Sequence, residues 1–362
     1  MKLKEKPEDF IVDELYNINL KKSGKYLIAK LKKTNWTTQR AILAVSRALK
    51  ISKVRVHYVG IKDKKAITTQ LISILGITKE DIEKINIKDI EVEFLGFMDE
   101  DLSSENLIGN KFKIKLNLTK NEENNLLENI KNIQKNGFVN YFGNQRFSGG
   151  STQNVGKYLL KKEYENALKN ILMNHTGELG KKFDIIVEEN WSKWKKILKE
   201  CPRIFGNESS VLNYLVKNPT DYPGAIRSIH KPIRKLYIHA YQSIIWNRSV
   251  SKMIEKENSY FSSYMNEKVN FSKNKIKNQE LNLIGYSSKI NSEFDKIQEK
   301  EIKKDKLNLD SFKLSSMPEL KSEGSFRNLI SNPNNLKYKN DVLEFELERG
   351  SYATVLIDAL IS

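Results

Sequence analysis

Residues 111–136 constrain the fold most, because an alternation of apolar and polar residues typical of a strand is followed directly by the apolar spacing typical of a helix. In residues 111–118, apolar side chains alternate with lysines, as in a strand that buries one face and exposes a basic one. Thr119 and Glu122 then have the spacing of a capping box, and an apolar stripe with helical spacing follows them. The chain is therefore expected to mix helices and strands.

Other segments fit the same class. Residues 36–51 and 233–254 carry apolar side chains at helical spacing, which predicts two further helices. Residues 25–31 and 342–347 are typical of strands. The strongly apolar residues 352–361 are expected to form a terminal strand that pairs back into the first part of the chain.

The length of 362 residues exceeds what one compact core usually serves, so two lobes or one domain with a large insertion are expected. No internal repeat of fixed period is present. Between residues 255 and 313 the composition shifts to Lys, Asn, Glu and Ser, which indicates a peripheral lobe rich in insertions.

The net charge of +17 predicts an acidic partner, and nucleic acid is the commonest one. The amino end has no apolar signal region and no apolar run is long enough to cross a bilayer, so a cytoplasmic protein without a membrane partner is expected. Cys201 is the single cysteine, and the four histidines lack metal-ligand spacing. No metal site is therefore predicted.

Residues 60–70 place one carboxylate, Asp63, among Lys62, Lys64 and Lys65, directly after an apolar run. A carboxylate in the path of a polyanion weakens binding, because RNA contacts favour Lys and Arg. Two interpretations remain open on these residues alone. Asp63 is either a solvated turn residue, which is the commoner case, or the reacting group that the basic surface serves.

The segment 140–147 combines aromatic rings with amide and guanidinium groups. Such a set can stack on bases and contact base edges through Asn140, Gln145 and Arg146. Phe142 fits equally well as a core residue. Taken alone, the aromatic residues favour the core interpretation.

A phosphate loop is excluded in the glycine-rich segment that follows. Gly150 and Gly156 have five residues between them, and Tyr158 stands where such a loop needs Ser or Thr. The motifs of dinucleotide-binding proteins, zinc proteases and serine hydrolases are also missing from the sequence. The chemistry is therefore expected to need neither a nucleotide cofactor nor a metal.

The sequence resembles the TruD-type tRNA pseudouridine synthases, in particular their archaeal branch. The shared motifs occur in the same order along the whole chain, and they lie at residues 4–12, 60–70, 140–147, 240–243, 317–320 and 350–354. Several unrelated motifs in the same order make a chance match improbable.

The resemblance implies an α+β fold. It implies a pseudouridine synthase catalytic domain with a mixed, largely antiparallel sheet and flanking helices, formed by residues 1–164 and 316–362. An inserted, family-specific α+β TRUD domain is expected at residues 165–315.

The resemblance also implies an isomerase that converts uridine to pseudouridine in tRNA, at position 13, without a cofactor. Asp63 would act as nucleophile or base at the ribose. Lys4 would hold Asp63 charged and oriented, and Phe10 would pack beside it. Asn140 would position the nucleotide, and Phe142 would stack on the flipped-out base.

The same resemblance implies RNA contacts from Lys62, Lys64, Lys65, Gln145 and Arg146. The implied partner is tRNA, and no obligate protein partner is expected. Two rival hypotheses stay open. A non-catalytic RNA-binding protein would explain the charge and the aromatic residues, and a metal-dependent nuclease would explain a carboxylate near RNA but needs clustered acidic ligands.

Overall fold

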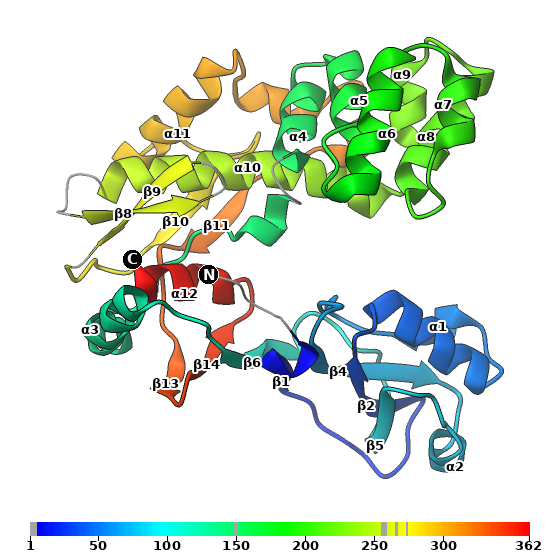
Figure 1. Ribbon diagram of the computed structural model, residues 1–362, viewed down its shortest axis with the longest axis vertical. Helices are drawn as coiled ribbons and strands as arrows, with labels where there is room; N and C mark the ends of the chain where they lie inside the picture. Colours follow the sequence, from blue (N-terminus) through cyan, green and yellow to red (C-terminus); the bar gives the residue numbers. More distant parts are fainter. Residues whose placement is uncertain (1–5, 148–150, 255–258, 265–266, 273) are drawn as a thin grey trace. The chain divides into compact units, whose positions relative to one another are not determined.

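The computed structural model describes residues 6–147, 151–254, 259–264, 267–272 and 274–362 (Figure 1). These residues divide into two compact units. The first comprises the chain up to Gly137 with Ser331–Ala353 and Leu360–Ser362, and the second comprises Phe138–Ile330 and Thr354–Ala359. This division rests on compactness, and the insertion expected at residues 165–315 stays a prediction about the domains of the family.

Eight strands form one sheet in the described part of the first unit. They are β1 (Phe10–Tyr16), β2 (Tyr26–Thr34), β3 (Val56–His57), β4 (Ile67–Leu75), β5 (Ile90–Met98), β6 (Leu107–Lys115), β13 (Asn334–Lys339) and β14 (Val342–Glu348). The order is β13-β14-β6-β1-β4-β2-β5, with β3 paired to β4. Strands β1 and β4 are parallel and the other pairs are antiparallel, so the mixed, largely antiparallel sheet is confirmed.

Helix α1 covers one face of this sheet where β2, β4 and β5 lie (Figure 1). The helices of the first unit are α1 (Thr38–Ala48), α2 (Lys79–Glu83) and α3 (Lys120–Asn136), with 3₁₀ turns at Pro7–Asp9 and Lys53–Arg55. The side chain of Thr37 caps α1 by accepting a hydrogen bond from the main-chain N–H of Arg40. The apolar stripe of α1 then packs against the inward side chains of β2 and β4, which form the core.

The alternation along β2 places one lysine on the buried face. Leu27, Ala29 and Leu31 are fully buried beneath α1, and Lys33 continues the same alternation with no exposed surface. Lys30 and Lys32 point to the opposite face, where they pair with glutamates of β5. The fold therefore buries a cation close to the start of α1.

The capping box predicted at Thr119 and Glu122 is confirmed at the start of α3. The helix ends at Gly137, whose φ of 74° is a conformation that favours glycine. The preceding strand β6 shows the predicted alternation, but two of its three lysines, Lys111 and Lys113, lie opposite glutamates of β14. Lys113 is opposite Glu344, and the two side chains form an ion pair of 3.6 Å. The expected basic face is therefore balanced by acidic residues.

The last residues of the chain form a helix, α12 (Ala353–Ile361), so the prediction of a terminal strand is wrong. Asn125 of α3 donates a hydrogen bond to the carbonyl of Ile361, and Asn129 donates one to the carbonyl of Leu360. These amides bind carbonyls at the end of α12, which have no partner within the helix. A short apolar run fits a strand or a helix equally, and here contacts distant in sequence favour the helix.

The second unit combines helices with short strands (Figure 1). Its helices are α4 (Thr152–Leu160), α5 (Tyr164–Leu172), α6 (Gly177–Glu189), α7 (Trp194–Glu200), α8 (Gly206–Lys217), α9 (Tyr222–Arg227), α10 (Lys231–Ile254) and α11 (Glu293–Lys304). Its strands are β7 (Phe138–Val139), β8 (Ser259–Tyr264), β9 (Glu267–Ser272), β10 (Glu280–Leu283) and β11 (Ser325–Asn328), and β12 (Ile330–Ser331) lies where the division falls. In the described residues of this unit, three 3₁₀ turns complete the elements, at Asn144–Phe147, Leu309–Lys313 and Pro318–Leu320.

Helix α10 forms the centre of the second unit and packs closely against α4. Gly156 makes this approach possible, because a Cβ atom at its position would lie 2.1 Å from the carbonyl oxygen of Tyr237. Gly156 does not belong to a phosphate loop, and its role is in packing. Within the described part of the chain, no helix combines the length and the apolar character needed to cross a membrane.

Candidate active site

Asp63 lies in the first unit, in the loop that joins β3 to β4. Its side chain is half-buried, whereas the neighbouring Lys64 and Lys65 are exposed. The loop ends at Ala66, which is fully buried and begins the path into β4. The carboxylate therefore sits at the surface of the unit on a loop anchored at its far end.

Buried polar side chains hold this loop by its main chain. The Gln70 side-chain amide donates a 3.0 Å hydrogen bond to the carbonyl of Gly60. The hydroxyl of Thr38, on α1, accepts a 2.9 Å hydrogen bond from the N–H of Lys62 and donates one of 3.0 Å to Gln70 Oε1. Thr38 and Gln70 are fully buried, so the hydrogen bond between them is shielded from water.

Lys33 binds the main chain of Asp63 itself. Its Nζ donates hydrogen bonds of 2.8 Å to the carbonyl of Asp63 and 2.6 Å to the carbonyl of Trp36. Burial lowers the pKa of Lys33 to about 8; the Asp63 carboxylate opposes this decrease and the Lys62 ammonium adds to it. The loop thus rests on a buried amine.

Lys62 binds a carboxylate within the protein. Its Nζ lies 2.9 Å from Glu14 of β1, and the side chains are 9% and 3% exposed. The same Nζ donates to the Asn110 side chain, and the other oxygen of Glu14 accepts a 2.9 Å hydrogen bond from the N–H of Leu71. Lys62 therefore supports the loop from inside, in contrast to the phosphate contact expected from the sequence.

Two further residues were expected near Asp63. Phe10 is 3% exposed, and its ring meets the edge of Phe112 at a centroid distance of 6.4 Å. It is thus a core residue at the start of β1. Lys4 lies outside the described residues, so its predicted pairing with Asp63 stays a prediction.

Asn140 lies in the second unit, where its side chain binds Arg327 of β11. The guanidinium donates a 2.7 Å hydrogen bond to Asn140 Oδ1 and one of 2.9 Å to the carbonyl of the same residue. The amide of Asn140 donates in turn to the carbonyl of Asn328 at 3.2 Å. This exchange fixes the segment 140–147 against β11.

Phe142 is 6% exposed and its ring faces arginine side chains. The guanidinium carbon of Arg327 lies 4.0 Å from the ring centroid and that of Arg146 lies 5.7 Å from it. Trp246 of α10 contacts the ring edge-on at 5.7 Å. Gln145, by contrast, is an exposed residue of the following 3₁₀ turn.

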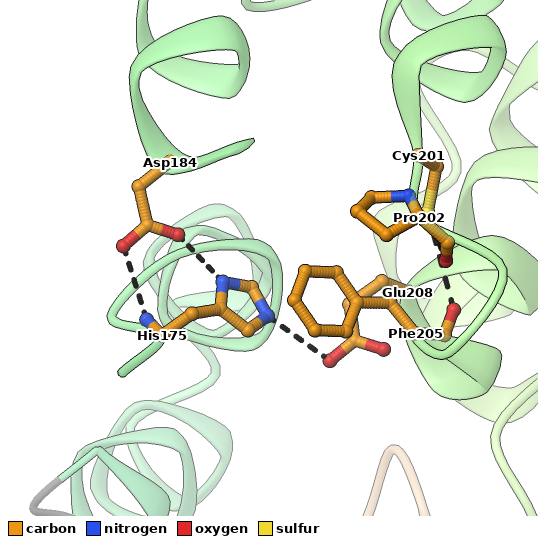
Figure 2. Close-up of polar contacts among 6 residues, drawn as sticks. All are labelled: His175, Asp184, Cys201, Pro202, Phe205 and Glu208. Atoms are coloured by element: carbon orange, nitrogen blue, oxygen red, sulfur yellow. Dashed lines mark hydrogen bonds and ion pairs between the residues drawn. The ribbon is translucent and has the colours of Figure 1, made fainter. Parts of the chain in front are cut away.

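A cluster in the second unit has groups that are common in active sites, but its geometry does not fit nucleophilic catalysis (Figure 2). His175 lies between Asp184 and Glu208, at 2.5 and 3.3 Å, and its ring stacks on Phe205. Cys201 instead contacts the carbonyls of Pro202 and Phe205. Burial raises the pKa of the thiol to about 11, so it is not poised as a thiolate.

The described residues include no group of three or more His, Cys, Asp or Glu side chains placed to hold a metal ion. The sequence analysis also missed the residues that hold the two segments in place. Lys33 and Thr38 support the loop of Asp63, and Arg327 supports the segment of Phe142. The alternation along β2 could have indicated that Lys33 is buried, because Lys33 lies two residues after Leu31 and therefore on the same face of the strand.

Comparison with known proteins places these segments in one family. A model of the family described as tRNA pseudouridine synthase D (TruD) matches residues 1–359. A probable tRNA pseudouridine synthase D of Archaeoglobus fulgidus is 31% identical, with 98% of this chain and 93% of the relative covered. A tRNA pseudouridine synthase D of Aquifex aeolicus is 30% identical, with 99% of this chain and 98% of the relative covered.

A solved structure agrees with these relatives. The crystal structure of a putative tRNA pseudouridine synthase D from Methanosarcina mazei superimposes with a TM-score of 0.69 at 29% identity. The match covers 99% of this chain and 93% of the solved one. The chain therefore belongs to the tRNA pseudouridine synthase D family and is an enzyme of the isomerase class.

Proposed function

We propose that this chain converts the uridine at position 13 of tRNA to pseudouridine, with the Asp63 carboxylate acting at the ribose. The reaction breaks the bond between C1′ and N1, turns the base and joins C5 to C1′. No atom is gained or lost, so one carboxylate suffices as nucleophile at C1′ or as base at C2′. Such tRNA chemistry is expected in the cytoplasm.

The observation that carries the proposal is the support of the Asp63 loop. Carbonyl and N–H groups of the loop bind Lys33, Thr38 and Gln70, all of which are fully buried. A solvated turn needs no such buried support, whereas a reacting group gains rate when its position is fixed before the substrate arrives. The support therefore favours a catalytic role over a turn residue.

The phosphate contacts proposed for this loop come from Lys64 and Lys65, which are exposed on the carboxyl side of Asp63. Lys62 is not a proposed phosphate contact, because its ammonium pairs with buried Glu14. In the second unit, exposed Gln145 and half-buried Arg146 are the proposed RNA contacts. These assignments rest on exposure and charge together.

Base stacking is a separate proposal about Phe142. Its ring is 6% exposed and Arg327 lies 4.0 Å from its centroid, so a base reaches the ring only when the guanidinium moves aside. The planar guanidinium is itself a stacking surface for bases. We therefore assign the platform to the pair, with Asn140 holding Arg327 through two hydrogen bonds.

Mapping pseudouridine in an unmodified tRNA transcript by carbodiimide modification and primer extension tests the function. Wild-type protein should mark position 13 without added metal, and Asp63→Asn should bind the transcript but react at least about 100-fold more slowly. Asp99→Asn is the matched control, because Asp99 is exposed in the same unit and pairs with Lys21. A wild type that modifies no transcript refutes the functional proposal.

The same assay separates the rival functions. A chelator should leave the rate unchanged, and a loss of activity would favour a metal-dependent enzyme. Unchanged rate in Asp63→Asn would remove Asp63 from the chemistry. A non-catalytic RNA-binding protein would bind the transcript in both forms and leave it unmodified.

A further inference from the structure

We propose that Lys33 is a positioning residue for Asp63, which fixes the main chain of that residue and keeps a positive charge beneath the reacting carboxylate. The inference rests on the proposed role of Asp63. It assigns to Lys33 a role in the reaction rate, beyond the stability of the sheet.

The Lys33 ammonium links two segments of main chain through hydrogen bonds, and we call this link the tie. Its Nζ donates to the carbonyl of Asp63 at 2.8 Å and to that of Trp36 at 2.6 Å. Trp36 stands two residues before α1 begins, so one amine joins the catalytic loop to the start of the helix that covers the core. Lys33 is fully buried on β2, which is held between β4 and β5. The tie is therefore anchored in the rigid part of the unit.

Joining two carbonyls does not by itself require a charge. The side-chain amide of Asn or Gln has two N–H donors, and burying it costs much less than burying an ammonium, which costs several kcal/mol. A cation at this position therefore needs an additional reason. The Asp63 carboxylate, which attracts the ammonium, supplies one.

Among the described residues, the charged groups that act on the pKa of Lys33 are Asp63 and Lys62, both on the loop. Lys62 repels the ammonium, but its own charge is paired with Glu14 at 2.9 Å. Of these two groups, Asp63 is the one that favours the cation, and by the same attraction the cation favours the carboxylate in its anionic, reactive form.

Deprotonation of Lys33 separates its two roles. A neutral amine keeps two N–H groups, which is the number that the carbonyls of Asp63 and Trp36 accept. Raising the pH past the pKa of Lys33, about 8, would therefore remove the charge and preserve the tie. A rate that depends on the charge should fall in the same range.

The experiment is a single-turnover rate of pseudouridine formation measured from pH 6 to pH 9.5. The wild-type rate should fall about tenfold between pH 7 and pH 9, as expected for a group with a pKa of about 8. Lys33→Met should be at least about tenfold slower at pH 7 and should lack this alkaline decrease. Lys33→Arg, which stays charged, should move the decrease to higher pH.

Lys32→Met is the matched control, since Lys32 is the next residue on β2, points to the opposite face and pairs with Glu91. It should keep the wild-type rate and pH profile. Equal alkaline decreases in wild type and Lys33→Met would overturn the proposal. Full activity of Asp63→Asn would instead refute the proposed function, so the two failures are distinguishable.

A second measurement remains valid if the Lys33 variants do not fold. In protein with ¹³C-labelled lysine, the Lys33 signal should titrate well below the other lysines by NMR. Asp63→Asn should lower that midpoint, because the carboxylate raises the pKa of Lys33. An unchanged midpoint would mean that the two groups do not interact, which overturns the proposal.

Discussion

Replacing Thr38 by valine keeps the volume of the side chain but removes the hydroxyl that ties α1 to the Asp63 loop. In the native protein this hydroxyl accepts from the N–H of Lys62 at 2.9 Å and donates to Gln70 Oε1 at 3.0 Å. Both hydrogen bonds are lost in Thr38→Val. No water can replace them at Gln70, which is fully buried.

The loss can be estimated from the two groups that are left unpaired. Leaving the buried oxygen of Gln70 without a hydrogen bond costs about 1–3 kcal/mol of stability, and leaving the partly buried N–H of Lys62 without one costs about 0.5–1.5 kcal/mol. Thr38→Val should therefore lower the free energy of unfolding by about 2–4 kcal/mol. If half of that is expressed as misplacement of Asp63, the rate falls about 5- to 30-fold, since each 1.4 kcal/mol is tenfold.

Thr38→Ser is the matched variant, because it keeps the hydroxyl and loses one methyl group, at about 0.8 kcal/mol. Denaturant unfolding and single-turnover pseudouridine formation should be measured on both variants. We expect Thr38→Val to be slower and less stable than Thr38→Ser. If the serine variant is equally slow, or if valine leaves the rate unchanged, hydrogen bonding through Thr38 does not position the loop.

Two further predictions concern the second unit. The contact with Glu208, followed by that with Asp184, raises the pKa of His175, so its charged form stabilises the fold fully below the unfolded pKa of about 6.5. That stabilisation disappears as the pH rises through the folded pKa. His175→Gln should therefore lower the melting temperature most below pH 6.5 and less above it. A decrease in melting temperature that stays constant from pH 5.5 to 9 would contradict the charge argument. Arg327→Met should slow pseudouridine formation at least about tenfold, because Asn140 loses two charge-assisted hydrogen bonds, and Arg327→Lys should not restore it. Normal activity in Arg327→Met would show that the stacking platform of Phe142 and Arg327 is not needed for the reaction. Arg203→Met is the control, because Arg203 is exposed.

Local patterns were sufficient to predict several elements. The capping box at Thr119 and the helical stripe after it gave α3, and the alternation in residues 111–118 gave much of β6. These signals depend on neighbours within a few residues, so tertiary contacts do not change them. The C-terminal helix α12 was mispredicted because its continuous apolar run lacks a period, and the amides of Asn125 and Asn129 come from a distant helix.

The residues around Asp63 also depend on contacts that are distant in sequence, which local patterns do not predict. A motif shared with a family indicates which residue to examine, but not which side chains hold it. Thr38 and Glu14 meet the loop only because α1 and β1 fold beside it, and Arg327 is far from Asn140 in sequence. Such partners become visible once the register of the strands is known.

The ion pair between Lys62 and Glu14 has a consequence for how this protein responds to salt. A lysine releases counterions from RNA only when its charge reaches a phosphate, and each such contact steepens the dependence of affinity on salt. The charge of Lys62 is paired with the Glu14 carboxylate inside the protein. With Lys64 and Lys65 as the proposed phosphate contacts, we expect this motif to release counterions through two lysines, although its sequence contains three.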